Sequence, residues 1–173
     1  MLLVTGACRS GKSDWAMEYA GHYGPRRLFL ATASPCDTEM EERIKRHQAL
    51  RDASWTTVEE GHDPAAIIRT HQDRYDVILL DCITLWLTNL LRRNLDDDTI
   101  FTRVDDLCTT LQAARIPVIM VTNETGWSIV PENSLARRFR DLSGLVNQRL
   151  AQASTRVILT VAGLPVIIKE QHV

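Results

Sequence analysis

The chain of 173 residues is predicted to form one α/β domain, residues 1–173, in which helices cover both faces of a mostly parallel sheet. Short apolar runs rich in β-branched residues alternate with segments of helical length, and this order is typical of parallel sheets. Several of the runs are apolar throughout, as expected for strands that are buried on both faces. A hydrophobic content of 45% and this length suit one domain with a full-sized core.

Six runs predict the strands, at residues 2–5, 28–33, 55–58, 77–80, 118–122 and 157–161. Three segments have recognisable helical features. "TEME" at residues 38–41 fits a capping box, and Asp63 followed by Pro64 is typical of a helix start. At residues 134–153 the helical spacing predicts one inward-facing stripe, formed by Leu135, Phe139, Leu142, Val146 and Leu150.

The most apolar stretch, residues 77–91, is interrupted by polar side chains and is too short to span a bilayer, which takes about 18 uninterrupted apolar residues. We therefore expect this stretch to form part of the core and not to insert into a membrane.

A net charge of −2 gives no basic footprint for nucleic acid, which favours a small-molecule partner. The N-terminus lacks the pattern of a secretory signal, and the four cysteines form no C-x-x-C pair. These features predict a cytoplasmic protein with reduced thiols.

The stretch "VTGACRSGKSDW" contains G-x-x-x-x-G-K-S between an apolar strand and a helix, the context that identifies a P-loop. This motif predicts a fold like that of the P-loop NTPases. Lys12 would reach the β- and γ-phosphates of a nucleotide, and the Ser13 hydroxyl would bind Mg²⁺. The predicted phosphate ligands are Gly6, Ala7, Cys8, Arg9, Ser10, Gly11, Lys12 and Ser13.

Asp81 directly follows the apolar strand at residues 77–80, an arrangement that resembles the Walker B carboxylate, a second ligand for Mg²⁺. The alternative is an ordinary strand-end aspartate that caps the next helix. No N-K-x-D motif for guanine is present; "TNE" at residues 122–124 lacks the lysine. The P-loop alone leaves kinase, ATPase and GTPase open.

The segment at residues 39–52 is predicted to be helical, and one arc of this helix carries Met40, Arg43, Ile44, His47 and Arg51. Two arginines and a histidine would be awkward in a plain core but useful beside bound phosphates. Imidazole is a competent nucleophile towards phosphorus. The alternative is that His47 is only a hydrogen-bonded or solvated residue.

Together with the P-loop, the patterns "RI..H...R", "TNE.G..IVPEN" and "R.F.D..G..NQ.LA" closely resemble the adenosylcobinamide kinase/adenosylcobinamide-phosphate guanylyltransferase family of cobalamin biosynthesis. The resemblance runs from residue 1 to about residue 169. It implies phosphorylation of adenosylcobinamide with ATP or GTP, followed by transfer of GMP from GTP to that phosphate, with release of pyrophosphate. The resemblance also implies a homotrimer.

In the family the second step passes through GMP linked to a histidine, and His47 lies at the matching place. The resemblance further implies that the nucleotide contacts Ala31, Thr32, Ala33, Gln48, Ala49, Leu50, Arg51, Glu59 and Asp81. A carboxylate such as Glu59 can accept hydrogen bonds from N1–H and the 2-amino group of guanine. The chain departs from the family pattern at three positions, namely Cys8, Thr125 and Ser128.

Two other functions fit the motifs less completely. One is a P-loop kinase with a single activity, in which His47 only binds phosphate. The other is a nucleotide-gated binding module in which residues 121–133 act as a switch. Transfer of label from the α-phosphate of GTP and steady turnover with cobinamide would separate these possibilities.

Overall fold

The computed structural model describes residues 1–34, 38–49 and 51–171; within residues 38–49, the side chains of residues 40, 43, 44, 46, 47 and 49 lie outside the description. In these ranges one sheet of seven strands has the order β3-β2-β4-β5-β1-β6-β7. All neighbours are parallel except β6 and β7. The strands are β1 Leu2–Gly6, β2 Arg27–Ala31, β3 Trp55–Glu59, β4 Val77–Asp81, β5 Val118–Val121, β6 Arg156–Val161 and β7 Leu164–Glu170. The predicted fold class is confirmed.

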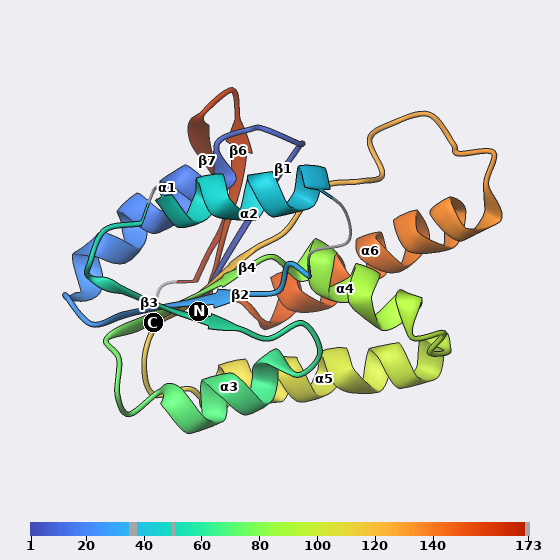
Figure 1. The fold of residues 1–173 in the computed structure, drawn as a ribbon. Helices are drawn as coiled ribbons and strands as arrows, with labels where there is room; N and C mark the ends of the chain where they lie inside the picture. Colours follow the sequence, from blue (N-terminus) through green and yellow to red (C-terminus); the bar gives the residue numbers. More distant parts are fainter. Residues whose placement is uncertain (35–37, 50, 172–173) are drawn as a thin grey trace.

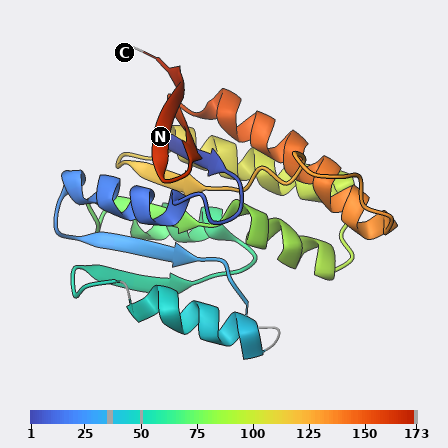
Figure 2. The same cartoon turned by 90° about the horizontal axis from the view of Figure 1, so that it is seen from above.

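Helices lie on both sides of this sheet (Figure 1). Their bounds are α1 Lys12–Ala20, α2 Thr38–Ala49, α3 Pro64–His71, α4 Ile83–Arg92, α5 Asp97–Ala113 and α6 Ser134–Ala153, with a 3₁₀ turn at Gly21–Tyr23. Apolar side chains of α3, α4, α5 and α6 share one core with one face of the sheet, and those of α1 share a second core with the other face. Figure 2 shows α2 running along the β3 edge.

The apolar stretch at residues 77–91 forms core, as predicted. The apolar side chains of β4 are completely buried, and α4 follows β4 directly. Trp86 of α4 is 1% exposed, and its indole N–H donates to the carbonyl of His62 at 2.9 Å. None of the described helices combines the length and the apolar character needed to cross a lipid bilayer.

The helix starts agree with the sequence in part. The carboxylate of Asp63 accepts from the backbone N–H of Ala66 at 3.0 Å, with Pro64 in the first turn of α3, so the predicted cap is confirmed. Helix α2 already includes Thr38, so the cap position falls on residue 37, which is not among the described residues. The predicted stripe on α6 is right for Leu142, Val146 and Leu150, which are buried. It is wrong for Leu135, which is 57% exposed because the first turn of α6 extends past the sheet (Figure 1).

Strand β7 is not among the predicted strands. It pairs antiparallel with β6 after a turn in which Ala162 and Gly163 both have positive φ. As the last strand of the sheet, it carries exposed side chains along nearly its whole length. The exposed apolar residues of this hairpin, which we call the β7 surface, are Val161, Leu164, Val166, Ile167 and Ile168.

Candidate functional site

The P-loop joins β1 to α1 in the conformation that its glycines permit. Gly6 has φ of +152°, and a Cβ there would lie 2.6 Å from the carbonyl oxygen of Thr160. Gly11 has φ of +89° and is the N-cap residue of α1. The first N–H groups of α1 therefore point toward the loop, an arrangement suited to binding phosphate. Lys12 is only 7% exposed, and its ammonium donates to the carbonyl of Ala7 at 2.5 Å.

The β6–β7 hairpin packs against the P-loop and holds it by hydrogen bonds. The hydroxyl oxygens of Ser10 and Thr160 are 2.7 Å apart, and the N–H of Gly163 donates to the carbonyl of Ser10 at 3.0 Å. A Cβ on Gly11 would lie 3.0 Å from the Cα of Gly163, so the two turns are in close contact. Sequence reasoning missed Thr160 and Gly163 because no local pattern links them to a loop about 150 residues earlier.

The carboxyl ends of β2 and β4 are tied together beside Asp81. The Thr32 hydroxyl donates to the carbonyl of Cys82 at 2.7 Å and accepts from the N–H of Cys82 at 2.8 Å. The amide of Asn89 donates to the carbonyl of Thr32 at 2.8 Å. Thr32 is completely buried, so its contacts position the strand end that carries Asp81. Ala31 and Ala33, on either side of it, are half-buried.

Gln48, Arg51 and Glu59 form a second group at the ends of α2 and β3. The amide of Gln48 donates to Glu59 at 3.3 Å. The Arg51 guanidinium lies 4.0 Å from the ring centroid of Phe29 and donates to the Thr57 hydroxyl at 3.0 Å. Burial lowers the pKa of Arg51, while the charges of Asp81 and Glu59 act in the opposite direction. Both carboxylates therefore lie within electrostatic reach of this guanidinium.

Three other predicted residues cannot be placed in the same way. The backbones of His47 and Ala49 belong to α2, but their side chains lie outside the described residues. Leu50 also lies outside them. His47 directly precedes Gln48 in α2, so its backbone lies next to that of a residue of the second group.

The two groups occupy the same edge of the sheet but different strands. In the sheet order, β1 and β3 are separated by four strand spacings, which amounts to roughly 19 Å. Asp81 on β4 lies between them. The candidate site is therefore a row of strand ends, with the predicted phosphate ligands at the end of β1 and in the loop after it, and the predicted guanine ligand Glu59 at the end of β3.

A third group of polar side chains, also missed from the sequence, follows β5. The carboxylate of Glu124 accepts from the Thr5 hydroxyl at 2.5 Å and from the Asn147 amide at 3.2 Å. Glu124 and Asn147 both fall within the family patterns "TNE.G..IVPEN" and "R.F.D..G..NQ.LA", but neither pattern shows that the two residues meet. The alternative of a nucleotide switch at residues 121–133 likewise did not reveal the partners of Glu124 on β1 and α6.

A family model described as cobinamide kinase/cobinamide phosphate guanyltransferase matches residues 2–168. The chain belongs to this family. Members that are similar to it include the bifunctional adenosylcobalamin biosynthesis protein CobU of Salmonella typhimurium, 44% identical over 98% of this chain and 99% of that protein. CobP of Pseudomonas aeruginosa is 40% identical over 96% of both chains. CobU of Escherichia coli is 39% identical over 98% of this chain and 99% of that protein.

Solved structures of much lower sequence identity share the fold of this chain. The RadB recombinase has a TM-score of 0.55 at 14% identity, covering 91% of this chain and 72% of its own. A KaiC-like protein from Pyrococcus horikoshii has a TM-score of 0.52 at 14% identity, covering 91% and 69%. The architecture of this family member is that of the P-loop NTPases.

Proposed function

We propose that this chain is a bifunctional enzyme of cobalamin biosynthesis and that one domain, residues 1–173, carries both reactions. It phosphorylates the hydroxyl of adenosylcobinamide with ATP or GTP and then transfers GMP from GTP to the new phosphate, releasing pyrophosphate. The match of the family model to residues 2–168 carries this proposal. The presence of a P-loop at the end of β1 supports it, since both reactions use a nucleoside triphosphate.

The P-loop residues Gly6 to Ser13 hold the triphosphate through backbone N–H groups, and Lys12 neutralises its charge. The hydroxyl of Ser13 and the carboxylate of Asp81 are the hard oxygen ligands that would hold Mg²⁺ with the nucleotide phosphates. They fit this ion: Ser13 is in the first turn of α1, which packs on β4, and Asp81 ends that strand. Among the described residues no group of three or more acidic, His or Cys side chains could hold a metal, and Mg²⁺ beside phosphates does not require one. The ion would neutralise charge that develops on the phosphates.

His47 is the nucleophile of the second reaction. Its imidazole attacks the α-phosphorus of GTP, the bond to the bridging oxygen breaks, and pyrophosphate leaves. The phosphate of adenosylcobinamide phosphate then displaces the imidazole and takes the guanylyl group. Attack requires the lone pair of a neutral imidazole nitrogen. The place of His47 beside Gln48 in α2 supports this assignment, because Gln48 contacts Glu59.

Glu59 reads the guanine, and the surrounding nucleotide contacts come from Ala31, Thr32, Ala33, Gln48, Ala49, Leu50 and Arg51. Glu59 is exposed at the end of β3, where its carboxylate can meet a base edge.

The other partners are small molecules, namely the corrinoid substrates, and we propose no nucleic-acid partner. The protein acts in the cytoplasm as a homotrimer, and the exposed apolar β7 surface supports association between copies.

Incubation with α-labelled GTP and Mg²⁺ tests the histidine directly. The native protein should acquire an acid-labile, alkali-stable label, as expected of a phosphoramidate, and should release pyrophosphate. His47→Ala should take up no label but still phosphorylate adenosylcobinamide. Lys12→Ala should lower both reactions by about 10²–10³-fold, because both need the same phosphate cradle. Arg115→Ala, which removes a positive charge from an exposed ion pair with Asp73, is the control.

The alternatives predict other outcomes in the same experiment. A kinase with a single activity would transfer γ-label to adenosylcobinamide and never acquire α-label. A nucleotide-gated binding module would show no steady turnover with cobinamide. If His47→Ala loses the kinase reaction as completely as the transfer, the residue serves nucleotide binding common to both reactions and not covalent catalysis.

A further inference from the structure

We propose that Glu124 is the general base of the kinase reaction, which accepts the proton of the substrate hydroxyl as that hydroxyl attacks the γ-phosphorus. This inference rests on the kinase activity proposed above. Three features of the chain carry it: the place of Glu124 in the sheet, the way its carboxylate is held, and the different proton requirements of the two reactions.

The sheet order places Glu124 between the two parts of the phosphate site. Strand β5 has β1, with the P-loop, on one side and β4, with Asp81, on the other. Val121 pairs with both Val4 and Asp81, so the three strands are level where the loops begin. The backbone N–H of Glu124 donates to the carbonyl of Gly6, the first P-loop glycine, at 3.0 Å.

The carboxylate of Glu124 is held on one oxygen. The Thr5 hydroxyl and the Asn147 amide both donate to Oε1, at 2.5 and 3.2 Å. These are the hydrogen bonds that the side chain accepts from the described residues, and they leave Oε2 to accept a proton. A carboxylate fixed at one oxygen keeps a constant orientation for proton transfer at the other.

Asn147, which holds this carboxylate, is itself fixed. It is 8% exposed, accepts from the Thr122 hydroxyl at 2.7 Å and donates to the carbonyl of Asn123 at 3.0 Å. The N–H of Asn123 in turn donates to the Thr84 hydroxyl at 2.9 Å. Helices α4 and α6 thus fix the residues after β5, and Glu124 does not depend on a flexible loop for its position.

In the kinase reaction the acceptor O–H bond breaks and its proton passes to Oε2 of Glu124. The acceptor oxygen forms a bond to the γ-phosphorus, and the bond from that phosphorus to the bridging oxygen breaks, with its electron pair leaving on the nucleoside diphosphate. In the second reaction the acceptor is already a phosphate anion, which has no hydroxyl proton to lose before attack. Glu124 is therefore needed as a base only in the first reaction.

The variant Glu124→Gln separates these roles, because its amide oxygen can still accept from Thr5 and Asn147 but cannot accept the proton. We expect kcat for adenosylcobinamide phosphorylation to fall by about 10²–10⁴-fold, with KM for the nucleotide unchanged. Guanylyl transfer, assayed with adenosylcobinamide phosphate supplied directly, should keep its rate. Glu132→Gln, an exposed glutamate in the same connection, is the matched control and should alter neither reaction.

A second variant, Glu124→Ala, should have little kinase activity and regain part of it when formate is added, since formate supplies the missing carboxylate. An equal loss of both reactions in Glu124→Gln, or an unchanged kcat for phosphorylation, would overturn the base assignment. Native protein that transfers guanylyl but has no kinase activity would overturn the proposed kinase function and the base together. Native protein with both activities and an unaffected variant would overturn the base alone.

Discussion

Next to Glu124, the hydroxyl of Thr125 is buried and has no hydrogen-bond partner within the described part of the chain. Leaving a buried polar atom unpaired costs about 1–3 kcal/mol. The family resemblance noted from the sequence gives an apolar residue at this position, which would avoid that cost. The hydroxyl of Thr125 is therefore an unsatisfied polar group in the described part of the chain, separate from the contacts that hold Glu124.

We predict that Thr125→Val raises the free energy of unfolding by about 1 kcal/mol, because valine keeps the shape and removes the unpaired hydroxyl. Urea denaturation measures this change. Thr122→Val is the matched control: the Thr122 side chain is completely buried and donates to Asn147, so its loss should lower the free energy of unfolding by about 1–3 kcal/mol. A destabilised Thr125→Val would show that the hydroxyl has a partner after all.

The sequence separation between contacting residues explains which site residues could be found from the sequence. Lys12 and Ser13 belong to a motif of eight consecutive residues, and the cap at Asp63 depends on a residue only three positions away. Glu124 binds Thr5, 119 residues earlier, and Ser10 meets Thr160, 150 residues later. Hydrogen bonds of that kind depend on strand order, which local patterns do not specify.

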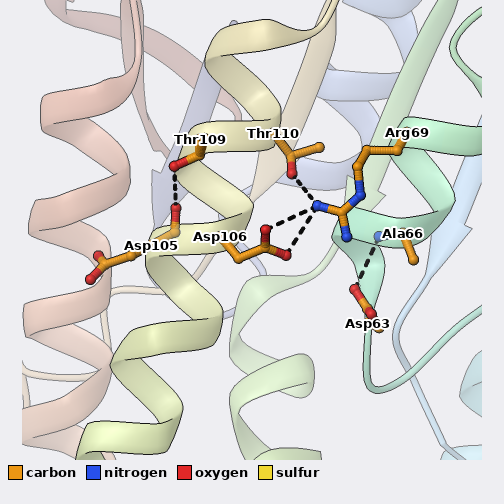
Figure 3. A network of polar contacts seen from close by, with 7 residues as sticks. All are labelled: Asp63, Ala66, Arg69, Asp105, Asp106, Thr109 and Thr110. Carbon is orange, nitrogen blue, oxygen red and sulfur yellow. Dashed lines mark hydrogen bonds and ion pairs between the residues drawn. The ribbon is translucent and has the colours of Figure 1, made fainter.

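Among the elements, α3 and α5 are joined by a polar network on the outside of the helical layer (Figure 3). The Arg69 guanidinium of α3 donates to both carboxylate oxygens of Asp106, at 3.0 and 3.1 Å, and to the Thr110 hydroxyl at 2.7 Å. The Arg69 and Asp106 side chains are 46% and 51% exposed, so water and salt screen the ion pair. The helices are held together mainly by the core beneath, which includes Ile68 and Leu107.

We expect Asp106→Asn to lower the free energy of unfolding by less than about 1 kcal/mol in low salt and by almost nothing in 1 M NaCl. At the start of α3, Asp63→Ala removes the helix cap and should lower the free energy of unfolding by about 0.5–2 kcal/mol, most of it retained in high salt. Urea denaturation at the two salt concentrations measures both. A salt-independent loss in Asp106→Asn would mean that the network contributes more than its exposure implies.

Element prediction succeeded where one face of a helix is buried and failed at the edge of the sheet. The bounds expected for α6, residues 134–153, are those observed, because its buried stripe recurs at helical spacing. Strand β7 was missed because its apolar residues do not alternate with polar ones, and both faces of the strand are exposed. Burial against another surface would explain why these exposed positions carry apolar side chains.

For the molecule as a whole, the β7 surface predicts association. An exposed apolar edge strand invites pairing with a second copy, and natural proteins seldom leave one uncovered. Ile167 and Ile168 are 53% and 60% exposed and lie where the register between β6 and β7 shifts by one residue. Copies of this chain should therefore meet at the β7 surface.

Light scattering should find the native protein in an oligomer, for which we propose a trimer. Ile167→Lys and Ile168→Lys test the β7 surface, and at least one of them should give monomers because it places a charge in the contact. Gln112→Lys, at an exposed position of α5, is the control for added charge. Native protein that stays monomeric at every concentration would contradict the assignment of the β7 surface to self-association.

The position of β1 in the sheet also sets the order in which the site can be assembled. Although β1 and the P-loop precede the rest of the sheet in the sequence, β1 pairs with β5 and β6, and the loop is held by hydrogen bonds to Thr160 and Gly163. Pairing over such sequence distances is slow, since a long chain must close before the contact forms. The P-loop therefore lacks these hydrogen bonds until residues 156–170 have joined the sheet, and we expect it to hold a nucleotide only after that late step of folding.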